Sequence, residues 1–196
     1  MSQCRILVDS NAYFRLAQSI HPLLNKEFGD KLYCLYCIKE LQDEYNRSSR
    51  LKNAFSWVND PEYVENRSHV LEISKEEKSE IKRAYDFILD YVHSVHPGVS
   101  KVDVRCLAHA EQLHIPVVTD DEEMLIVARE YGIATFKTLE LLKLMLGCRY
   151  IGIDKVREIA SYWIYLNDRP KDFMTDYKKL FGEAPSKDRN LDSINS

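Results

Sequence analysis

Several acidic residues stand at points of this sequence where carboxylates are costly to place. Each ends an apolar run or heads an apolar helical pattern, so each is expected at a strand-to-helix junction or in the first turns of a helix. These residues are Asp9, Glu40, Asp103 and Asp121. Carboxylates gathered at such positions repel one another unless a positive group joins them. A hard divalent cation is the expected partner, and the chemistry that it supports is metal-dependent catalysis.

The elements that must position these side chains alternate between strands and helices. Apolar runs predict strands at residues 4–8, 32–36, 70–73, 115–119 and 133–136. Helical periodicity predicts helices at residues 13–20, 38–56, 75–95, 101–113, 124–131 and 138–146, and residues 21–31 are expected to form a loop. This alternation is typical of a mostly parallel sheet with helices on both faces. Ligands bind at the carboxyl edge of such sheets, where Asp9 and Asp121 both follow strands.

A helical extension follows the alternating part of the chain. Its two apolar stripes are Val156, Ile159, Ala160 and Trp163, then Phe173, Tyr177, Leu180 and Phe181. Amphipathic helices must bury such stripes, and no linker rich in Gly or Pro precedes them. We therefore expect one α/β domain over residues 1–150, an extension over residues 151–183 packed on it, and a flexible tail over residues 184–196. The alternative is that the stripes dock an inhibitor or a second copy of the chain.

Composition narrows the class of protein. The chain has 196 residues, of which 45% are hydrophobic, and no run approaches the ~18 apolar residues of a membrane-spanning helix. No signal peptide is visible, and an odd count of five cysteines favours a reducing, cytoplasmic setting. The net charge of −4 argues against broad electrostatic attachment to nucleic acid. It does not exclude a local groove in which a metal contacts the phosphates.

Each acid also has an ordinary structural explanation. Asp9 has the residue type of an N-cap, as do Asp120 and Asp121 before the next helix. Asp103 lies in a first turn, where it favours the helix dipole, and it has capping-box spacing from Ser100. Spacing alone does not prove that these carboxylates converge.

The order of these motifs along the chain resembles that of PIN-domain nucleases. The similar segments are Val8-Asp9-Ser10-Asn11, Ile38-Lys39-Glu40-Leu41, Val102 to Ala110, and the strand from Ile115 followed by Thr119-Asp120-Asp121-Glu122-Glu123. The resemblance spans roughly residues 5–140. It implies a PIN-like three-layer α/β fold, with a mostly parallel central sheet, helices on both faces and the helical extension added at the end of the chain.

The resemblance also implies roles for particular residues. Asp9, Glu40, Asp103 and Asp121 would be catalytic and would bind Mg²⁺ or Mn²⁺. Glu44, one turn after Glu40, is an alternative ligand, and Asp120 and Glu123 are alternatives around Asp121. Apart from the resemblance, Ser10, Asn11 and Thr119 are candidates to orient ligands or water, although loop or cap positions explain them equally well. Candidates to meet RNA phosphates are Arg15, Arg47, Lys101 and Arg105, although most basic residues on helices only form solvated faces.

The function implied is metal-assisted hydrolysis of RNA phosphodiester bonds. Similar proteins are toxins of toxin–antitoxin pairs, so an inhibitor protein (antitoxin) is an expected partner beside the RNA substrate, and a homodimer stays open. One alternative is a non-catalytic PIN-like module that binds RNA or acts as a scaffold. A second is a phosphotransfer domain with Asp9 as nucleophile, which Asn11 disfavours because that reaction needs an acid there. Cys34 and Cys37 have CxxC spacing, but no second pair follows to complete a zinc site.

Overall fold

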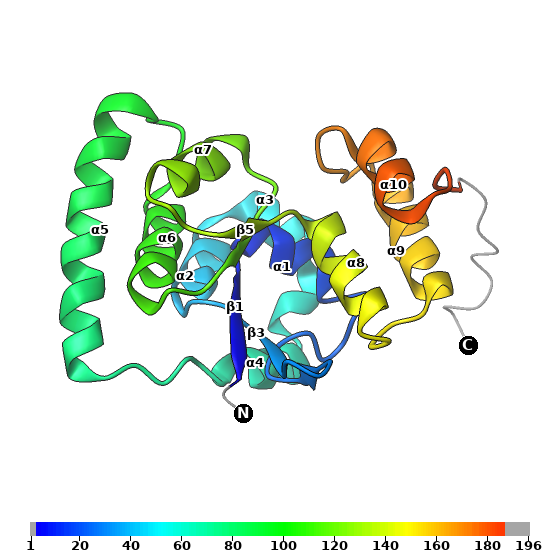
Figure 1. The fold of residues 1–196 in the computed structure, drawn as a ribbon, viewed down its shortest axis with the longest axis horizontal. Coiled ribbons are helices and arrows are strands. Elements are labelled where there is room, and N and C mark those ends of the chain that lie inside the picture. Colours follow the sequence, from blue (N-terminus) through cyan, green and yellow to red (C-terminus); the bar gives the residue numbers. More distant parts are fainter. Residues whose placement is uncertain (1–2, 187–196) are drawn as a thin grey trace. The chain divides into compact units, whose positions relative to one another are not determined.

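The short apolar runs form one five-stranded sheet in the computed structural model, which describes residues 3–186 (Figure 1). Its order is β2-β3-β1-β4-β5. The strands are β1 (Cys4–Val8), β2 (Glu27–Phe28), β3 (Tyr33–Tyr36), β4 (Val117–Val118) and β5 (Thr135–Phe136). β3, β1, β4 and β5 are parallel, and β2 joins the edge antiparallel to β3. The prediction of a mixed α/β protein with a mostly parallel sheet is confirmed.

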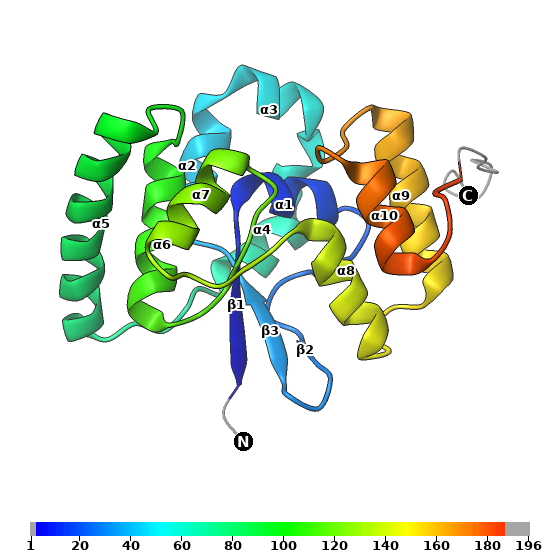
Figure 2. The same ribbon diagram turned by 45° about the horizontal axis from the view of Figure 1, so that its top comes forward.

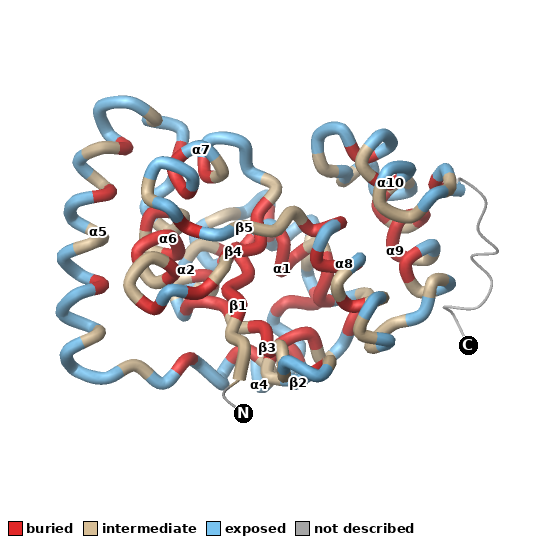
Figure 3. The backbone as a smooth tube through the Cα atoms, in the orientation of Figure 1, coloured by how far each residue is buried: buried red, intermediate tan, exposed pale blue. Residues whose placement is uncertain are grey.

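The central strand β1 is buried on both of its faces. Ile6, Leu7 and Val8 are each no more than 1% exposed, although successive side chains in a strand point to opposite faces. Leu7 pairs in register with Val117, and both belong to a core cluster that includes residues of the helices α5 to α7. A strand covered on both faces explains the continuous apolar run in the sequence. Figure 3 shows this buried centre in the first part of the chain.

Seven α-helices and one 3₁₀ helix accompany the sheet within residues 3–137. They are α1 (Ser10–Leu16), α2 (Glu40–Arg47), α3 (Ser49–Ala54), η1 (Ser56–Asn59), α4 (Pro61–Ser68), α5 (Lys75–Val95), α6 (Lys101–Leu113) and α7 (Glu122–Glu130). The long α5 lies beside α6 in both ribbon views (Figures 1 and 2). Their starts are capped in the same way, with Ser74 and Glu77 at α5 and Ser100 and Asp103 at α6 forming reciprocal capping boxes.

Three local predictions were wrong. The helix expected at residues 38–56 divides at Ser48, whose backbone is extended and whose hydroxyl accepts a hydrogen bond from the Leu51 N–H at 3.2 Å. A serine that can cap a new helix competes with continuing the old one. Residues 70–73 form no strand. Leu71 of this segment is nevertheless buried, by packing and not by strand pairing. The loop expected at 21–31 contains β2, which pairs with β3 at the sheet edge.

The chain divides after Lys137 into two compact units. The second contains α8 (Thr138–Gly147), α9 (Ile153–Leu166) and α10 (Phe173–Phe181). The division between these units falls before α8, and the domain boundary near residue 150 stays a prediction. Packing of residues 151–183 on the first unit stays a prediction, and most of the expected tail, residues 187–196, lies outside the described residues.

Both apolar stripes of the extension are largely buried. Val156, Ile159 and Ala160 have no exposed surface, and Trp163 is 1% exposed. Within the second unit, the ring of Trp163 on α9 packs edge-on against Phe173 of α10, with 6.0 Å between ring centroids. The Lys143 ammonium of α8 lies 5.7 Å from the Phe181 ring centroid. The three helices therefore share a core of their own.

Candidate active site at the carboxyl edge of the sheet

Asp9 and the acids after β4 are brought together by the parallel pairing of β1 with β4. Val8 is level with Val118, and the Asp9 N–H donates to the Val118 carbonyl at 3.1 Å. Since the strands run in the same direction, Asp9 and Asp120 leave the sheet at the same edge. Glu40 follows β3, the other parallel neighbour of β1, and begins α2 at that edge.

Asp9 is both a helix cap and an unusually placed carboxylate. Its Oδ1 accepts a hydrogen bond from the Ala12 N–H at 2.6 Å, so it is the N-cap of α1. Its Oδ2 is buried without a hydrogen-bond partner, and the residue is 3% exposed. Burial raises the pKa of Asp9 to about 7, and the negative charges of Asp103 and Asp120 add to the rise, although the Thr119 hydroxyl opposes it. This carboxyl therefore sits where a proton or a cation is favoured.

Asp103 is held in place by the capping box of α6. Its Oδ2 accepts from the Ser100 N–H at 3.0 Å, and its own N–H donates to the Ser100 hydroxyl at 3.1 Å. The pKa of Asp103 is raised by burial, with further contributions from the charges of Glu44 and Asp121, although the bonds to Ser100 act in the opposite direction. Asp103 and Asp9 line the same small cavity. The capping explanation is therefore correct for this residue, and its place beside Asp9 keeps it a candidate for the site.

The two acids after β4 differ in their surroundings. Asp121 is exposed and is the N-cap of α7, with its Oδ1 accepting from the Met124 N–H at 2.8 Å. Asp120 instead forms an ion pair with Arg15 of α1, with 2.6 Å between Nη1 and Oδ2. Arg15, which the sequence suggested for phosphate binding, thus compensates one of the clustered acids.

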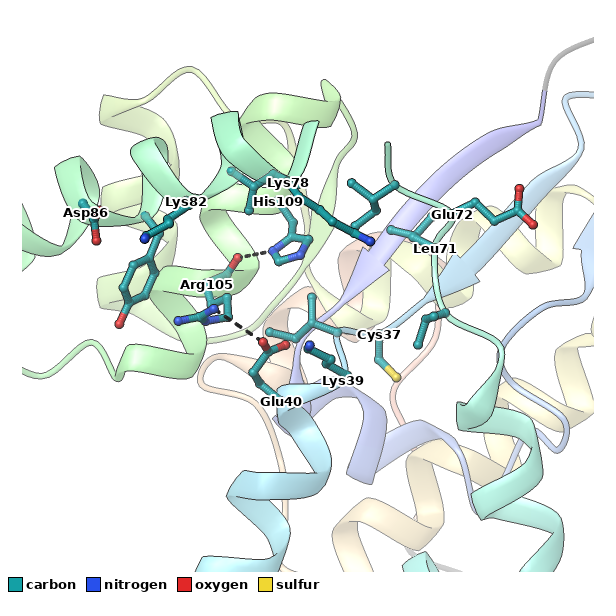
Figure 4. A pocket seen from close by; sticks show the side chains of 15 residues that line it. Cys37, Lys39, Glu40, Leu71, Glu72, Lys78, Lys82, Asp86, Arg105 and His109 are labelled. Atoms are coloured by element: carbon teal, nitrogen blue, oxygen red, sulfur yellow. Dashed lines mark hydrogen bonds and ion pairs between the residues drawn. The ribbon is translucent and has the colours of Figure 1, made fainter. Parts of the chain in front are cut away.

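Glu40 and Glu44, one turn apart on α2, each have a buried carboxylate oxygen, Oε2, without a hydrogen-bond partner. The Oε1 of Glu40 lies 3.6 Å from Nη1 of Arg105, on the wall of a larger cavity (Figure 4). Glu44 is the one of the two whose charge raises the pKa of Asp103. Glu44 is therefore linked electrostatically to Asp103, and both glutamates stay candidates for the site.

The remaining predicted residues lie around this group to different degrees. Ser10 is buried and lines the small cavity with Asp9, Thr119 is buried beside it, and Asn11 is exposed. Glu123 packs close to Gly98, where an added Cβ would lie 2.4 Å from its Oε2. The exposed Arg47 ends α2, and the exposed Lys101 begins α6.

The donor chemistry of this group fits a hard divalent cation. The orphaned oxygens of Asp9, Glu40 and Glu44 are carboxylate oxygens, which Mg²⁺ and Mn²⁺ prefer, and buried polar atoms normally have partners. Across residues 3–186, however, no three side chains of His, Cys, Asp or Glu are grouped closely enough to hold one ion. Metal binding would therefore require these carboxylates to move closer together.

The larger cavity beside Glu40 was not anticipated from the sequence. It has a volume of about 650 Å³ and is lined from α2, residues 70–73, α5 and α6. One sequence feature could have indicated this cavity: Lys78, Lys82 and Tyr85 are spaced four and three residues apart, which places them along one face of a helix.

All five cysteines lie within the described residues and are free thiols. Among those same residues, no helix is both long and apolar enough to cross a membrane. The fold is that of an α/β protein, and Asp9, Glu40 and Asp120 follow its parallel strands at their carboxyl edge.

Comparisons with known proteins add little to this description. No protein-family model matches the sequence, and no curated protein matches it. Among solved structures, the chain is similar to one described as "Crystal Structure of FitAcB from Neisseria gonorrhoeae". The identity is 16%, the alignment covers 68% of this chain and 98% of that one, and the TM-score is 0.43. At that score the likeness supports no inference, so the α/β assignment depends on the sheet order and register described above.

Proposed function

We propose that this protein is a metal-dependent ribonuclease that hydrolyses RNA phosphodiester bonds with Mg²⁺ or Mn²⁺. The observation that carries the proposal is the Oδ2 of Asp9. It is buried without a hydrogen-bond partner, and Asp9 shares its small cavity with Asp103. The cap of α1 accounts for one oxygen of this carboxylate, and a proton or a cation would compensate the other. The PIN-like order of the acidic motifs along the chain agrees with this chemistry.

Asp9, Asp103, Asp121 and either Glu40 or Glu44 would hold the cation. When bound, it supplies a more acidic water and a positive charge beside the phosphate. The Ser100 backbone N–H holds the Asp103 carboxylate by donating to its Oδ2, and the Ser100 hydroxyl holds the start of α6 by accepting from the Asp103 N–H. Arg15 compensates Asp120, which limits the repulsion that the other acids meet before metal binds. Arg105 lies at the edge of the group and is placed to contact a phosphate.

The resemblance to PIN-domain toxins extends the proposal to a toxin restrained by an antitoxin protein. The five free thiols are consistent with action in a reducing cytoplasm. The competing candidate is a PIN-like module that binds RNA without cutting it. The orphaned carboxylate oxygens favour the enzyme, because a module that only binds RNA would gain nothing from buried negative charges near the phosphates.

The test is Asp103→Asn, with Asp90→Asn as a matched control. Asp90 is an exposed carboxylate on α5, away from the acid group. The purified full chain should cleave single-stranded RNA only with millimolar Mg²⁺ or Mn²⁺. Asp103→Asn should lose cleavage by more than the roughly 10–100-fold that loss of an outer-shell partner costs. The control should cleave like the parent protein.

Thermal melts of the same proteins provide a second readout. Metal should raise the Tm of the parent and of Asp90→Asn, because a ligand that binds only the folded state stabilises it, and it should raise that of Asp103→Asn much less. RNA binding without cleavage in any metal would favour the non-catalytic module. Wild-type cleavage by folded Asp103→Asn would remove Asp103 from the mechanism.

A further inference from the structure

The cavity of about 650 Å³ beside Glu40 shares Glu40 and Arg105 with the proposed cleavage site, but the rest of its lining has no part in the chemistry proposed above. Its volume falls in the range of roughly 300–1,000 Å³ that is usual for sites of small ligands. Ile38 lines both this cavity and the small cavity of Asp9 and Asp103. A molecule bound in the larger cavity would therefore lie next to the acidic group.

One part of the lining is apolar and suits a flat ring. It comes from the residues just before α2, the segment at residues 70–73 and α5, and it consists of Ile38, Leu71, Ile73, Ile81 and Tyr85. The segment at residues 70–73 is held against the core by Leu71, which is 8% exposed. An apolar wall with a few polar groups is the usual composition of a pocket that binds a small organic molecule.

A second part of the lining is cationic, although the chain as a whole carries a net charge of −4. Four basic side chains and three carboxylates line the cavity, and the basic ones are Lys39, Lys78, Lys82 and Arg105. Lys78 and Lys82 are four residues apart on α5, so they lie on one face of that helix. Figure 4 shows both side chains extending from α5 above the pair of Arg105 and Glu40. A phosphate is the kind of group that such a lining favours.

Arg105 is held in position before any ligand binds. Its guanidinium carbon lies 4.4 Å from the ring centroid of Tyr85, and its Nη1 lies 3.6 Å from the Oε1 of Glu40. A guanidinium that is fixed on one face by an aromatic ring offers its other face to a second planar group. Nucleobases stack on arginine in this way when RNA is bound as a single strand.

His109 adds a hydrogen-bond acceptor to the same lining. Its Nδ1 lies 2.7 Å from the carbonyl oxygen of Arg105, and because a carbonyl can only accept, Nδ1 carries the proton. Burial lowers the pKa of His109, which favours the neutral ring. The Nε2 atom of a neutral ring protonated at Nδ1 accepts hydrogen bonds. Base edges that present N–H groups are suitable donors for it.

We propose that this cavity binds one nucleotide of the RNA substrate, with its base against the apolar wall and the Arg105 guanidinium and its phosphate beside Lys78 and Lys82. The assignment to RNA rests on the proposed ribonuclease function. A free mononucleotide has the same chemistry, so both sources must be tested separately.

The experiment measures binding of nucleoside 5′-monophosphates and of a short oligoribonucleotide to the full chain without metal, by calorimetry and by NMR shifts. One variant is Lys78→Ala combined with Lys82→Ala. Its matched control is Lys75→Ala combined with Arg83→Ala, which removes two exposed charges from the same helix outside the lining. A third variant, Tyr85→Leu, removes the ring beneath Arg105. Thermal melts establish that each variant folds.

We expect both ligands to bind and to shift signals from residues that line the cavity. The Lys78/Lys82 and Tyr85 variants should each weaken binding about tenfold, as loss of a stacking or phosphate contact does, and the control should not. Equal weakening in the control, or no binding of either ligand, would overturn the proposal. Binding of monophosphates without the oligoribonucleotide would overturn the assignment to RNA.

Asp103→Asn separates this proposal from the proposed function. This variant should bind nucleotides like the parent protein and yet not cleave RNA. If the parent protein cleaves no RNA under any condition but the oligoribonucleotide still binds through Tyr85 and the two lysines, the ribonuclease assignment fails and the nucleotide site stands. If cleavage is normal and the Tyr85 variant binds and cleaves RNA like the parent, the nucleotide site fails alone.

Discussion

At the scale of single residues, Asp9 shows how one side chain serves the fold and the site together. One oxygen caps α1 and the other is buried without a partner. The cap explains why an aspartate is tolerated there, but it uses only half of the carboxylate. Burial of this carboxylate is the main reason that the pKa of Asp9 is raised from 3.8 to about 7.

This shift predicts how the stability of the metal-free protein depends on pH. The folded state holds the Asp9 proton more tightly than the unfolded state does. The protonated Asp9 side chain therefore makes its whole contribution to the free energy of unfolding below about pH 4, and this contribution is lost as the pH rises to about 7. The loss is up to roughly 4 kcal/mol, at about 1.4 kcal/mol for each pKa unit. Asp9→Asn, which can still cap α1, should remove most of this dependence.

Urea unfolding at several pH values between 4 and 7 measures the effect, with Asp90→Asn as the control for loss of an exposed carboxylate. Added Mg²⁺ or Mn²⁺ should restore the stability of the parent protein at pH 7, because a cation replaces the proton. An equally steep decline in Asp9→Asn would show that another group is responsible.

At the scale of elements, two helices begin in the same way but with different consequences. Ser74 and Glu77 cap α5, and Ser100 and Asp103 cap α6, with reciprocal bonds in both cases. The first box contains only exposed or half-buried residues, whereas the acid of the second is one of the grouped carboxylates. The start of α6 therefore couples helix capping to the geometry of the site.

Ser74→Ala and Ser100→Ala separate these two roles. Each substitution should lower the free energy of unfolding by about 1 kcal/mol, because each removes one capping hydroxyl. Only Ser100→Ala should also reduce metal affinity and RNA cleavage, by up to roughly 10–100-fold, since it loosens the first turn of α6 that positions Asp103, although the backbone N–H of residue 100 can still bond its carboxylate. Denaturation and calorimetry on the pair provide the measurements. Similar losses of cleavage in both variants would mean that stability alone limits activity.

At the scale of the whole molecule, the chain consists of two units that each have a core of their own. The second unit is built from α8 to α10, and its aromatic contacts join α9 to α10. A cut at residue 150 would separate α8 from the two helices with which it shares that unit. A cut after Lys137 would remove the unit intact.

We therefore predict that a protein ending at Lys137 is more soluble and melts at a higher temperature than one ending at Tyr150, although it is shorter. In the longer fragment, the apolar residues of α8 lose the partners that bury them, and exposed apolar stripes promote aggregation. Solubility and thermal melts of the two fragments decide the matter. The opposite ranking would show that α8 belongs with the sheet, as a boundary at residue 150 implies.

The sequence alone determined the features that depend on neighbours within a few residues. The strand Cys4–Val8 and the capping box at Ser100 and Asp103 were predicted from the sequence because their signals are local. The same reasoning failed at Ser48 and at residues 70–73, where a cap and the tertiary packing of Leu71 outweighed periodicity and β-propensity.

Only the tertiary structure decided which charged groups meet. Arg15 and Asp120 are 105 residues apart and form an ion pair, and Glu40 meets Arg105 across α2 and α6. The tertiary structure also brings together the four separate segments of the chain that line the cavity of about 650 Å³. Periodicity places a side chain on a face of its own element, but it carries no information about which distant element covers that face. That pairing arises from the burial of apolar surface in the whole unit, and it fixes the partners of each carboxylate.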